Sequence, residues 1–188
     1  MRIIAGSLRG RDLGAVPRGV RPTTDRVRES LFSVLGPVSG LSVLDLFSGT
    51  GAFGFEALSR GATEVVFVEQ SRRVVRDLRV RIAALGLSEG EEIQILATDS
   101  KRAIRRLARD GPARFDLVFL DPPYEEGDRV GTLDALFPSG LLRPGARVVV
   151  EGPKRDPIPP RPGVAVLEVR DYGDTMLTWL EASSRIQE

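Results

Sequence analysis

The feature that most constrains the fold is the segment 43–54, where an apolar run passes into a glycine-rich turn and then into a helical pattern. Gly49, Gly51 and Gly54 fit the spacing G-x-G-x-x-G. Glycines at these positions permit a tight turn and let a ligand approach the backbone closely. In a strand–turn–helix context, the pattern predicts a site for a nucleotide-like cofactor without indicating which one.

Short apolar runs alternate with helical patterns from residue 41 onward. Most of these runs lack polar alternation, as strands covered by helices on both faces do. The predicted strands are 42–47, 64–69, 92–97, 115–120 and 146–151, and the predicted helices between them include 71–85 and 99–108. Strands that alternate with helices favour a parallel sheet in a doubly wound α/β fold.

The end of the chain follows a different pattern. A proline-rich loop at 153–162 precedes two further predicted strands, 164–170 and 175–181, which are separated by a short link. Such a link favours an antiparallel hairpin. A mostly parallel seven-stranded sheet that ends in an antiparallel hairpin is typical of Rossmann-like, class I methyltransferases dependent on S-adenosylmethionine, and it is unusual in dinucleotide dehydrogenases.

Acidic residues lie at the end of the second predicted strand, after the third, and just before the glycine turn. Glu69 ends the second strand, where a carboxylate accepts hydrogen bonds from both hydroxyls of a ribose. Asp45 suits the positively charged amino end of S-adenosylmethionine and would repel a pyrophosphate. Asp99 fits an adenine amine and a helix N-cap equally well. The predicted cofactor set is Asp45, Ser48, Gly49, Thr50, Gly51, Glu69, Asp99 and Ser100.

The most specific motif is Asp121-Pro122-Pro123-Tyr124, which follows the fourth predicted strand. An exocyclic amine of a nucleic-acid base is a poor nucleophile because its lone pair is delocalised into the ring. Acceptors that hold both N–H bonds turn this lone pair toward a methyl donor. Asp121 and the Pro122 carbonyl are the predicted acceptors, Pro123 stiffens the corner, and Tyr124 offers a ring on which the base can stack.

Composition limits the available chemistry. The chain contains neither cysteine nor histidine. Disulfides, Cys/His zinc sites and Cys or Ser-His nucleophiles are therefore excluded, and so is the cysteine mechanism of methylation at a pyrimidine carbon. No metal is expected. No apolar run reaches the length of a membrane span, and the N-terminus does not resemble a signal peptide, so we expect a cytoplasmic protein.

The first 28 residues carry a net charge of +5, while the whole chain of 188 residues carries +1. Such an arm on a near-neutral body favours contact with a phosphate backbone. We expect residues 1–40 to form a basic, RNA-binding extension, packed on a methyltransferase domain at 41–188, with a hairpin of 2–5 and 11–13 and a helix over 25–35 capped by Thr23 or Thr24. The candidate RNA contacts are Arg2, Arg9, Arg11, Arg21, Thr23, Thr24, Arg26 and Arg28.

With these motifs assembled, nearly the whole chain resembles the RsmD family of bacterial 16S rRNA guanine-N2 methyltransferases. The resemblance rests on segments 2–6, 21–29, 31–32, 44–51, 67–69, 121–124 and 172–175. The segment 121–124 is shared by many DNA and RNA methyltransferases, whereas the segment 21–29 is far more particular to this family. The resemblance implies S-adenosylmethionine as cofactor and N2 methylation of one guanine in the small ribosomal subunit; we expect a monomer.

Three alternatives remain open from the residues alone. Another nucleic-acid amino-methyltransferase, such as a DNA adenine N6 enzyme, fits segment 121–124 equally well. An NAD-dependent oxidoreductase fits the glycine turn and Glu69, but it leaves segment 121–124 and the basic arm unexplained. A non-enzymatic RNA-binding factor fits the arm alone.

Overall fold

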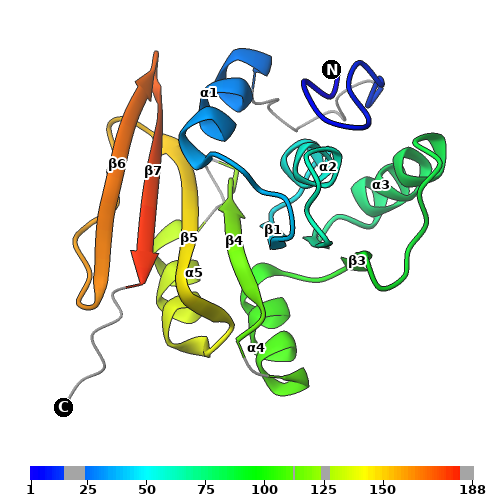
Figure 1. Cartoon of the computed structure of the whole chain (residues 1–188). Coiled ribbons are helices and arrows are strands. Elements are labelled where there is room, and N and C mark those ends of the chain that lie inside the picture. The colour runs from blue at the N-terminus through cyan, green and yellow to red at the C-terminus, as the bar shows by residue number, and fades with distance from the viewer. Residues whose placement is uncertain (15–23, 112, 124–127, 183–188) are drawn as a thin grey trace. The chain divides into compact units, whose positions relative to one another are not determined.

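The computed structural model describes residues 1–14, 24–111, 113–123 and 128–182 (Figure 1). The chain divides into two compact units, Met1–Ser100 and Lys101–Glu188. No helix of the described residues is long and apolar enough to cross a membrane. The predicted domain boundary near residue 40 stays a prediction.

The first unit contains the strands β1 (Ser42–Leu46), β2 (Glu64–Val68) and β3 (Ile93–Leu96). The three strands are parallel, with β2 paired to both neighbours. Every residue of β1 is buried, as the unbroken apolar run predicted. The connecting helices are α2 (Ala52–Ser59) and α3 (Arg72–Ala84). The Ser71 side chain caps α3 by accepting a hydrogen bond from the Val74 N–H.

The N-terminal segment of the first unit forms the predicted hairpin and helix. Arg2 and Asp12 make an antiparallel bridge, and the Ile3 N–H donates to the Arg11 carbonyl at 3.1 Å. Helix α1 covers Asp25–Leu35, and its N-cap is Thr24, whose side chain accepts from the Val27 N–H. From here on, the arm means residues 1–14 alone, the described part of the basic N-terminal segment that precedes the cap of α1. Thr23, the other predicted cap, lies outside the described residues.

The second unit contains α4, β4 (Phe115–Leu120), α5 (Arg129–Leu136), the short 3₁₀ helix η1 (Phe137–Ser139), β5 (Leu142–Pro153), β6 (Val164–Tyr172) and β7 (Thr175–Ala182). Helix α4 spans Ser100–Asp110, so its first residue closes the first unit. Strand β4 is parallel to β5, whereas β7 is antiparallel to both β5 and β6. The predicted C-terminal hairpin is therefore confirmed.

Within the described residues, the seven strands have the order β3-β2-β1-β4-β5-β7-β6. The sheet is parallel except at β7, and this arrangement confirms the predicted α/β, Rossmann-like class. Helix α5 was not predicted, and β5 begins four residues before the predicted strand 146–151. A register irregularity between Phe115 and Leu117 of β4 accommodates the additional residues, which include Pro144 and Gly145.

Candidate functional site

The glycine turn after β1 has a strained backbone. Phe47, Gly49 and Gly51 have φ values of 64°, 52° and 78°, in the left-handed region. A Cβ atom at Gly51 would lie 2.6 Å from the Phe55 ring, and one at Gly54 would lie 2.2 Å from the Phe67 ring. Glycine is therefore required for the turn at Gly51 and for packing of α2 on β2 at Gly54.

Phe47 is the non-glycine residue with positive φ among the described residues. A left-handed conformation at a bulky residue is uncommon and costs on the order of 1–3 kcal/mol. Backbone strain of this kind concentrates where a loop must hold a fixed shape, so Phe47 belongs to the candidate site. Sequence reasoning missed Phe47, because nothing in its chemistry marks a strained position.

The Ser48 side chain holds the turn from inside. Its buried hydroxyl donates to the Asp45 carbonyl at 2.7 Å and accepts from the Val68 N–H at 2.8 Å. The Ser48 N–H also donates to the Val68 carbonyl at 2.9 Å. Ser48 therefore fixes the turn to the end of β2, and the contacts recorded for its hydroxyl are structural.

Glu69 follows β2 and lies next to the glycine turn. One carboxylate oxygen accepts from the Gly49 N–H at 3.1 Å, and the other accepts from the Ser71 N–H at 2.7 Å. A carboxylate offers about four acceptor positions in total. Two backbone donors therefore orient Glu69 while leaving each oxygen capacity for one further donor, which is the arrangement that two ribose hydroxyls need.

Asp45 is the last residue but one of β1 and has an exposed fraction of 2%. Its Oδ2 accepts a hydrogen bond from the Gly54 N–H at 3.2 Å. Burial raises the pKa of the Asp45 carboxyl from 3.8 to about 7; the Gly54 hydrogen bond opposes this rise and the Glu69 charge adds to it. A cation brought next to Asp45 would relieve the cost of its charge, as expected for a group that receives an ammonium.

The other predicted cofactor residues of the first unit lie at the ends of its elements. Thr50 is buried inside the turn, Asp99 is half-buried after β3, and Ser100 is buried at the start of α4. The two roles proposed for Asp99, adenine contact and helix cap, stay predictions. The structure therefore brings the glycine turn, Asp45 and Glu69 into one hydrogen-bonded group.

The motif of segment 121–124 belongs to the second unit. Asp121 directly follows β4 and is half-buried, Pro122 is buried and Pro123 is exposed. Tyr124 lies outside the described residues, and its stacking role stays a prediction. Leu120, the last residue of β4, pairs in register with Val150 of β5. Asp121 therefore stands at the carboxyl end of a buried parallel strand, where ligands bind in α/β sheets.

The candidate RNA residues of the first unit divide into exposed and buried groups. Arg2, Arg9, Arg11, Thr24 and Arg26 are exposed, although the Arg11 guanidinium donates to the Ala84 carbonyl at 2.7 Å. The Thr24 hydroxyl caps α1. Arg21 and Thr23 lie outside the described residues.

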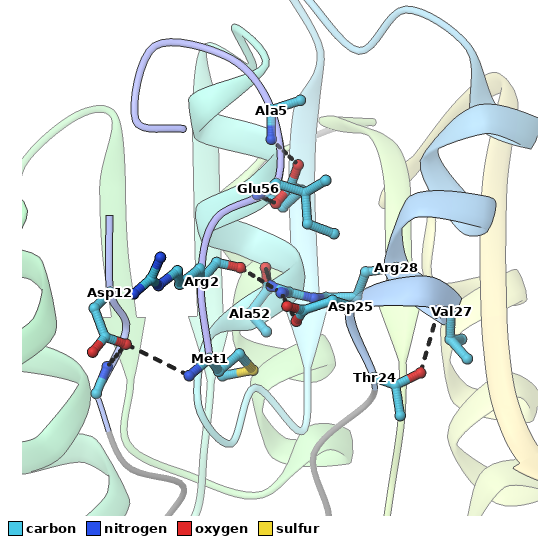
Figure 2. Close-up of polar contacts among 12 residues, drawn as sticks. Met1, Arg2, Ala5, Asp12, Thr24, Asp25, Val27, Arg28, Ala52 and Glu56 are labelled. Atoms are coloured by element: carbon cyan, nitrogen blue, oxygen red, sulfur yellow. Dashed lines mark hydrogen bonds and ion pairs between the residues drawn. The ribbon is translucent and has the colours of Figure 1, made fainter. Parts of the chain in front are cut away.

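Arg28 requires a correction. Its side chain is 0% exposed, and its guanidinium donates to the Arg2 carbonyl at 2.5 Å, to Asp25 at 2.7 Å and to the Ala52 carbonyl at 3.5 Å (Figure 2). A buried guanidinium with these partners has no surface for a phosphate. Arg28 therefore joins the arm, α1 and α2, and it leaves the set of candidate RNA contacts.

Glu56 on α2 was not predicted and has a matching role. Its fully buried carboxylate accepts from the Ile4 N–H at 2.8 Å, from the Ala5 N–H at 3.0 Å and from Arg60 at 2.8 Å. Figure 2 shows Glu56 pointing at the arm from α2. An acid on an otherwise apolar helix was the available signal, but its two backbone partners in the arm are more than 50 residues away in sequence.

The described residues contain no group of three or more acids placed to hold a metal ion.

Comparison with known proteins identifies the family. The family described as conserved hypothetical protein 95 matches residues 1–181. The ribosomal RNA small subunit methyltransferase D of Escherichia coli K12 is 38% identical over 165 residues, covering 86% of this chain and 79% of the relative. This chain belongs to the RsmD family.

A second relative matches nearly the whole chain. The putative rRNA methyltransferase YlbH of Bacillus subtilis 168 is 35% identical over 178 residues, covering 93% of this chain and 95% of the relative. The solved structure of the putative methyltransferase yhhF from Escherichia coli has a TM-score of 0.84 at 29% identity, covering 98% of this chain and 99% of that chain. The resemblance inferred from the motifs is therefore confirmed.

A more distant structure supports the fold alone. A putative methyltransferase complexed with SAH has a TM-score of 0.66 at 16% identity, covering 83% of this chain and 48% of that chain. The two proteins therefore share an overall fold despite their low sequence identity.

Proposed function

We propose that this protein transfers a methyl group from S-adenosylmethionine to the exocyclic N2 of one guanine in 16S rRNA of the small ribosomal subunit. The observation that carries the proposal is the segment Asp121-Pro122-Pro123 directly after β4, in a chain whose relatives are named rRNA methyltransferases. A ribosomal substrate would place the reaction in the cytoplasm.

The first unit supplies the groups that hold the cofactor. Glu69 is oriented by two backbone N–H groups and accepts from the ribose hydroxyls. Asp45 neutralises the ammonium group, and the strained turn from Phe47 to Gly51 lets the cofactor approach the backbone. A fold neighbour solved with SAH, the demethylated form of this cofactor, is consistent with that assignment.

The second unit supplies the groups that hold the base. The Asp121 carboxylate and the Pro122 carbonyl each accept one N–H bond of the guanine amine, and Tyr124 stacks on the base. With both N–H bonds held, the nitrogen lone pair points at the sulfonium methyl. The N–CH₃ bond forms as the S–CH₃ bond breaks, the sulfur leaves as a neutral thioether, and the surplus proton passes from nitrogen to Asp121 or to water.

This mechanism gives a specific test. Asp121→Ala should lower turnover by about 100-fold to 1000-fold or more, since it removes an acceptor that acts in the transition state, and it should leave cofactor affinity within about twofold. Asp116→Ala is the matched control, because Asp116 lies on the same strand and pairs with Arg143 at the surface. Retained activity in Asp121→Ala would contradict the proposed role.

The modified base is identified by mass spectrometry of nucleosides after reaction with small subunits that lack the modification. N2-methylguanosine at one site supports the proposal, whereas N6-methyladenosine in DNA indicates the other amino-methyltransferase. Separate titrations with NADH and S-adenosylmethionine test the oxidoreductase alternative. Absence of any methyl transfer with tight RNA binding would indicate a non-enzymatic RNA-binding factor.

A further inference from the structure

Helix α3 of the first unit exposes a row of arginines. Arg72, Arg73 and Arg76 are exposed, and none of them forms an ion pair with another described residue. Asp77 is the acid of this helix, and it interacts electrostatically with Arg81. The opposite side of α3 is apolar and buried, so the exposed side is the surface that is available to a partner.

The stability of the helix does not explain this row. The first turn of α3 contains no acid, and it carries Arg72 and Arg73 at the helix end whose dipole is positive. Arg72 and Arg76 are four residues apart, so two like charges are also neighbours on the helix surface. Both arrangements are unfavourable in the isolated protein, and a bound polyanion would make both favourable.

The arm is attached to the same helix. Arg11 donates to the Ala84 carbonyl at 2.7 Å at the C-terminal end of α3, and the Arg81 side chain donates to the Leu13 carbonyl at 2.5 Å. On its other side the arm is held by Glu56 and Ser59 of α2. Figure 1 shows the arm running beside α2 and α3. The exposed Arg9 at the tip of the arm therefore has a fixed position relative to the arginines of α3.

From these observations we infer that the arm and the exposed side of α3 together form one RNA-binding surface, which contacts the phosphate backbone of the substrate around the target nucleotide. The surface is defined by Arg9, Arg72, Arg73 and Arg76. This inference rests on the proposed function for the choice of RNA as polyanion. It adds α3 to a binding role that the sequence motifs had placed only within residues 1–40.

The chemistry of the surface favours phosphate over a lipid bilayer. Arginine presents a planar fork of donors that matches phosphate oxygens, and a fixed set of such forks lowers the entropic cost of binding. Insertion into a membrane requires an apolar helix face, but the apolar residues Val74, Val75, Leu78 and Ile82 are buried in the core. Val80 is the large apolar residue of α3 that remains strongly exposed, at 69%.

The test compares two triple variants that remove the same charge. Arg72→Gln/Arg73→Gln/Arg76→Gln changes the proposed surface, whereas Arg105→Gln/Arg106→Gln/Arg109→Gln changes three exposed arginines of α4. Affinity is measured at several salt concentrations for undermodified small subunits and, separately, for a mixed-sequence RNA duplex. Affinity for S-adenosylmethionine is measured on each variant to verify that the first unit remains intact.

We expect the α3 variant to lose at least about tenfold in RNA affinity and to lower the slope of log K against log salt by about 2–3, since each phosphate contact contributes nearly one unit. The α4 variant should bind RNA like the wild type, and both variants should bind the cofactor like the wild type. Unchanged RNA binding by the α3 variant, or an equal loss in the α4 variant, would overturn the inference. So would an α3-dependent affinity for anionic lipid vesicles that exceeds the affinity for RNA.

The same measurements separate this inference from the proposed function. Suppose that the wild type methylates small subunits and the α3 variant does so equally well at subsaturating substrate. The inferred RNA-binding surface is then wrong, whereas the proposed methyltransferase function is supported. If the wild type methylates no subunit but binds the RNA duplex through α3, the surface stands and the proposed function fails.

Discussion

Replacing Asp45 by asparagine should change how the stability of the cofactor-free protein depends on pH. Burial raises the pKa of the Asp45 carboxyl from 3.8 to about 7, with the Glu69 charge contributing to the rise. In the unfolded chain the same carboxyl has a pKa of about 3.9. Between these values the native state therefore retains a proton that the unfolded state has released.

The sign and size of the effect follow from this difference. Stability from the protonated carboxyl is fully present below about pH 4 and is lost as the pH rises through about 7. A pKa difference of about three units corresponds to roughly 4 kcal/mol, a substantial share of the roughly 5–15 kcal/mol that stabilises a typical domain. Asparagine carries no charge at any pH in this range and can still accept from the Gly54 N–H, so Asp45→Asn avoids the loss.

The assay is guanidinium unfolding of the wild type and Asp45→Asn at a series of pH values between about 4 and 8. The free energy of unfolding of the variant relative to the wild type should increase by up to about 4 kcal/mol across this range, because other titrating groups cancel in the difference. Asp12→Asn is the control, because a hydrogen bond from the Gly14 N–H lowers the pKa of Asp12. The free energy of unfolding of Asp12→Asn relative to the wild type should therefore decrease as the pH rises, which is the opposite direction. A difference for Asp45→Asn that does not vary with pH would refute the reasoning.

Two further predictions concern the cofactor and the arm. If Asp45 receives the ammonium group of S-adenosylmethionine, titration calorimetry should show that the wild type binds this cofactor about 15-fold more tightly at about pH 7 than at about pH 5.5. Asp45→Asn should remove this pH dependence. Equal affinities of the wild type at the two pH values would exclude that role for Asp45. Glu56→Gln should lower the free energy of unfolding by about 2–4 kcal/mol and speed hydrogen exchange at Ile4 and Ala5, since one acceptor becomes a donor facing buried donors. The control Glu89→Gln breaks an exposed pair with Arg79 and should cost less than about 1 kcal/mol; similar losses in both variants would contradict the role of Glu56.

The elements that were predicted from sequence are those specified by local patterns. The strand at 115–120 and the helix at 25–35 match β4 and α1 at both ends, and the Thr24 cap was among the two predicted. These elements have an unbroken apolar run, or an apolar stripe with a polar cap in front of it. For such elements, nearby residues in the sequence largely determine where the helix or strand begins and ends.

Long-range contacts explain what sequence reasoning missed. Helix α5 has few periodic apolar residues, and it begins where Asp128 caps it and pairs with Lys101, 27 residues away. The early part of β5 contains Pro144 and Gly145, which indicate a turn locally but are tolerated beside an irregular register of β4. In the sequence, Arg28 cannot be distinguished from a surface arginine. Its burial depends on a hydrogen bond to the Arg2 carbonyl, 26 residues away.

The contacts of Arg28 and Glu56 also change how the basic arm is understood. An arginine-rich N-terminal segment read from sequence alone could be a tether that becomes ordered only on RNA. Here two buried charges fix it to α2: Glu56 accepts from the Ile4 and Ala5 N–H groups, and Arg28 links the Arg2 carbonyl to that of Ala52. Ala52 is the first residue of α2, directly after the glycine turn. Helix α2, which begins directly after the glycine turn, therefore also positions the arm. RNA phosphates bound at the arm would be held in a fixed relation to that turn, without the entropic cost of ordering a free tether.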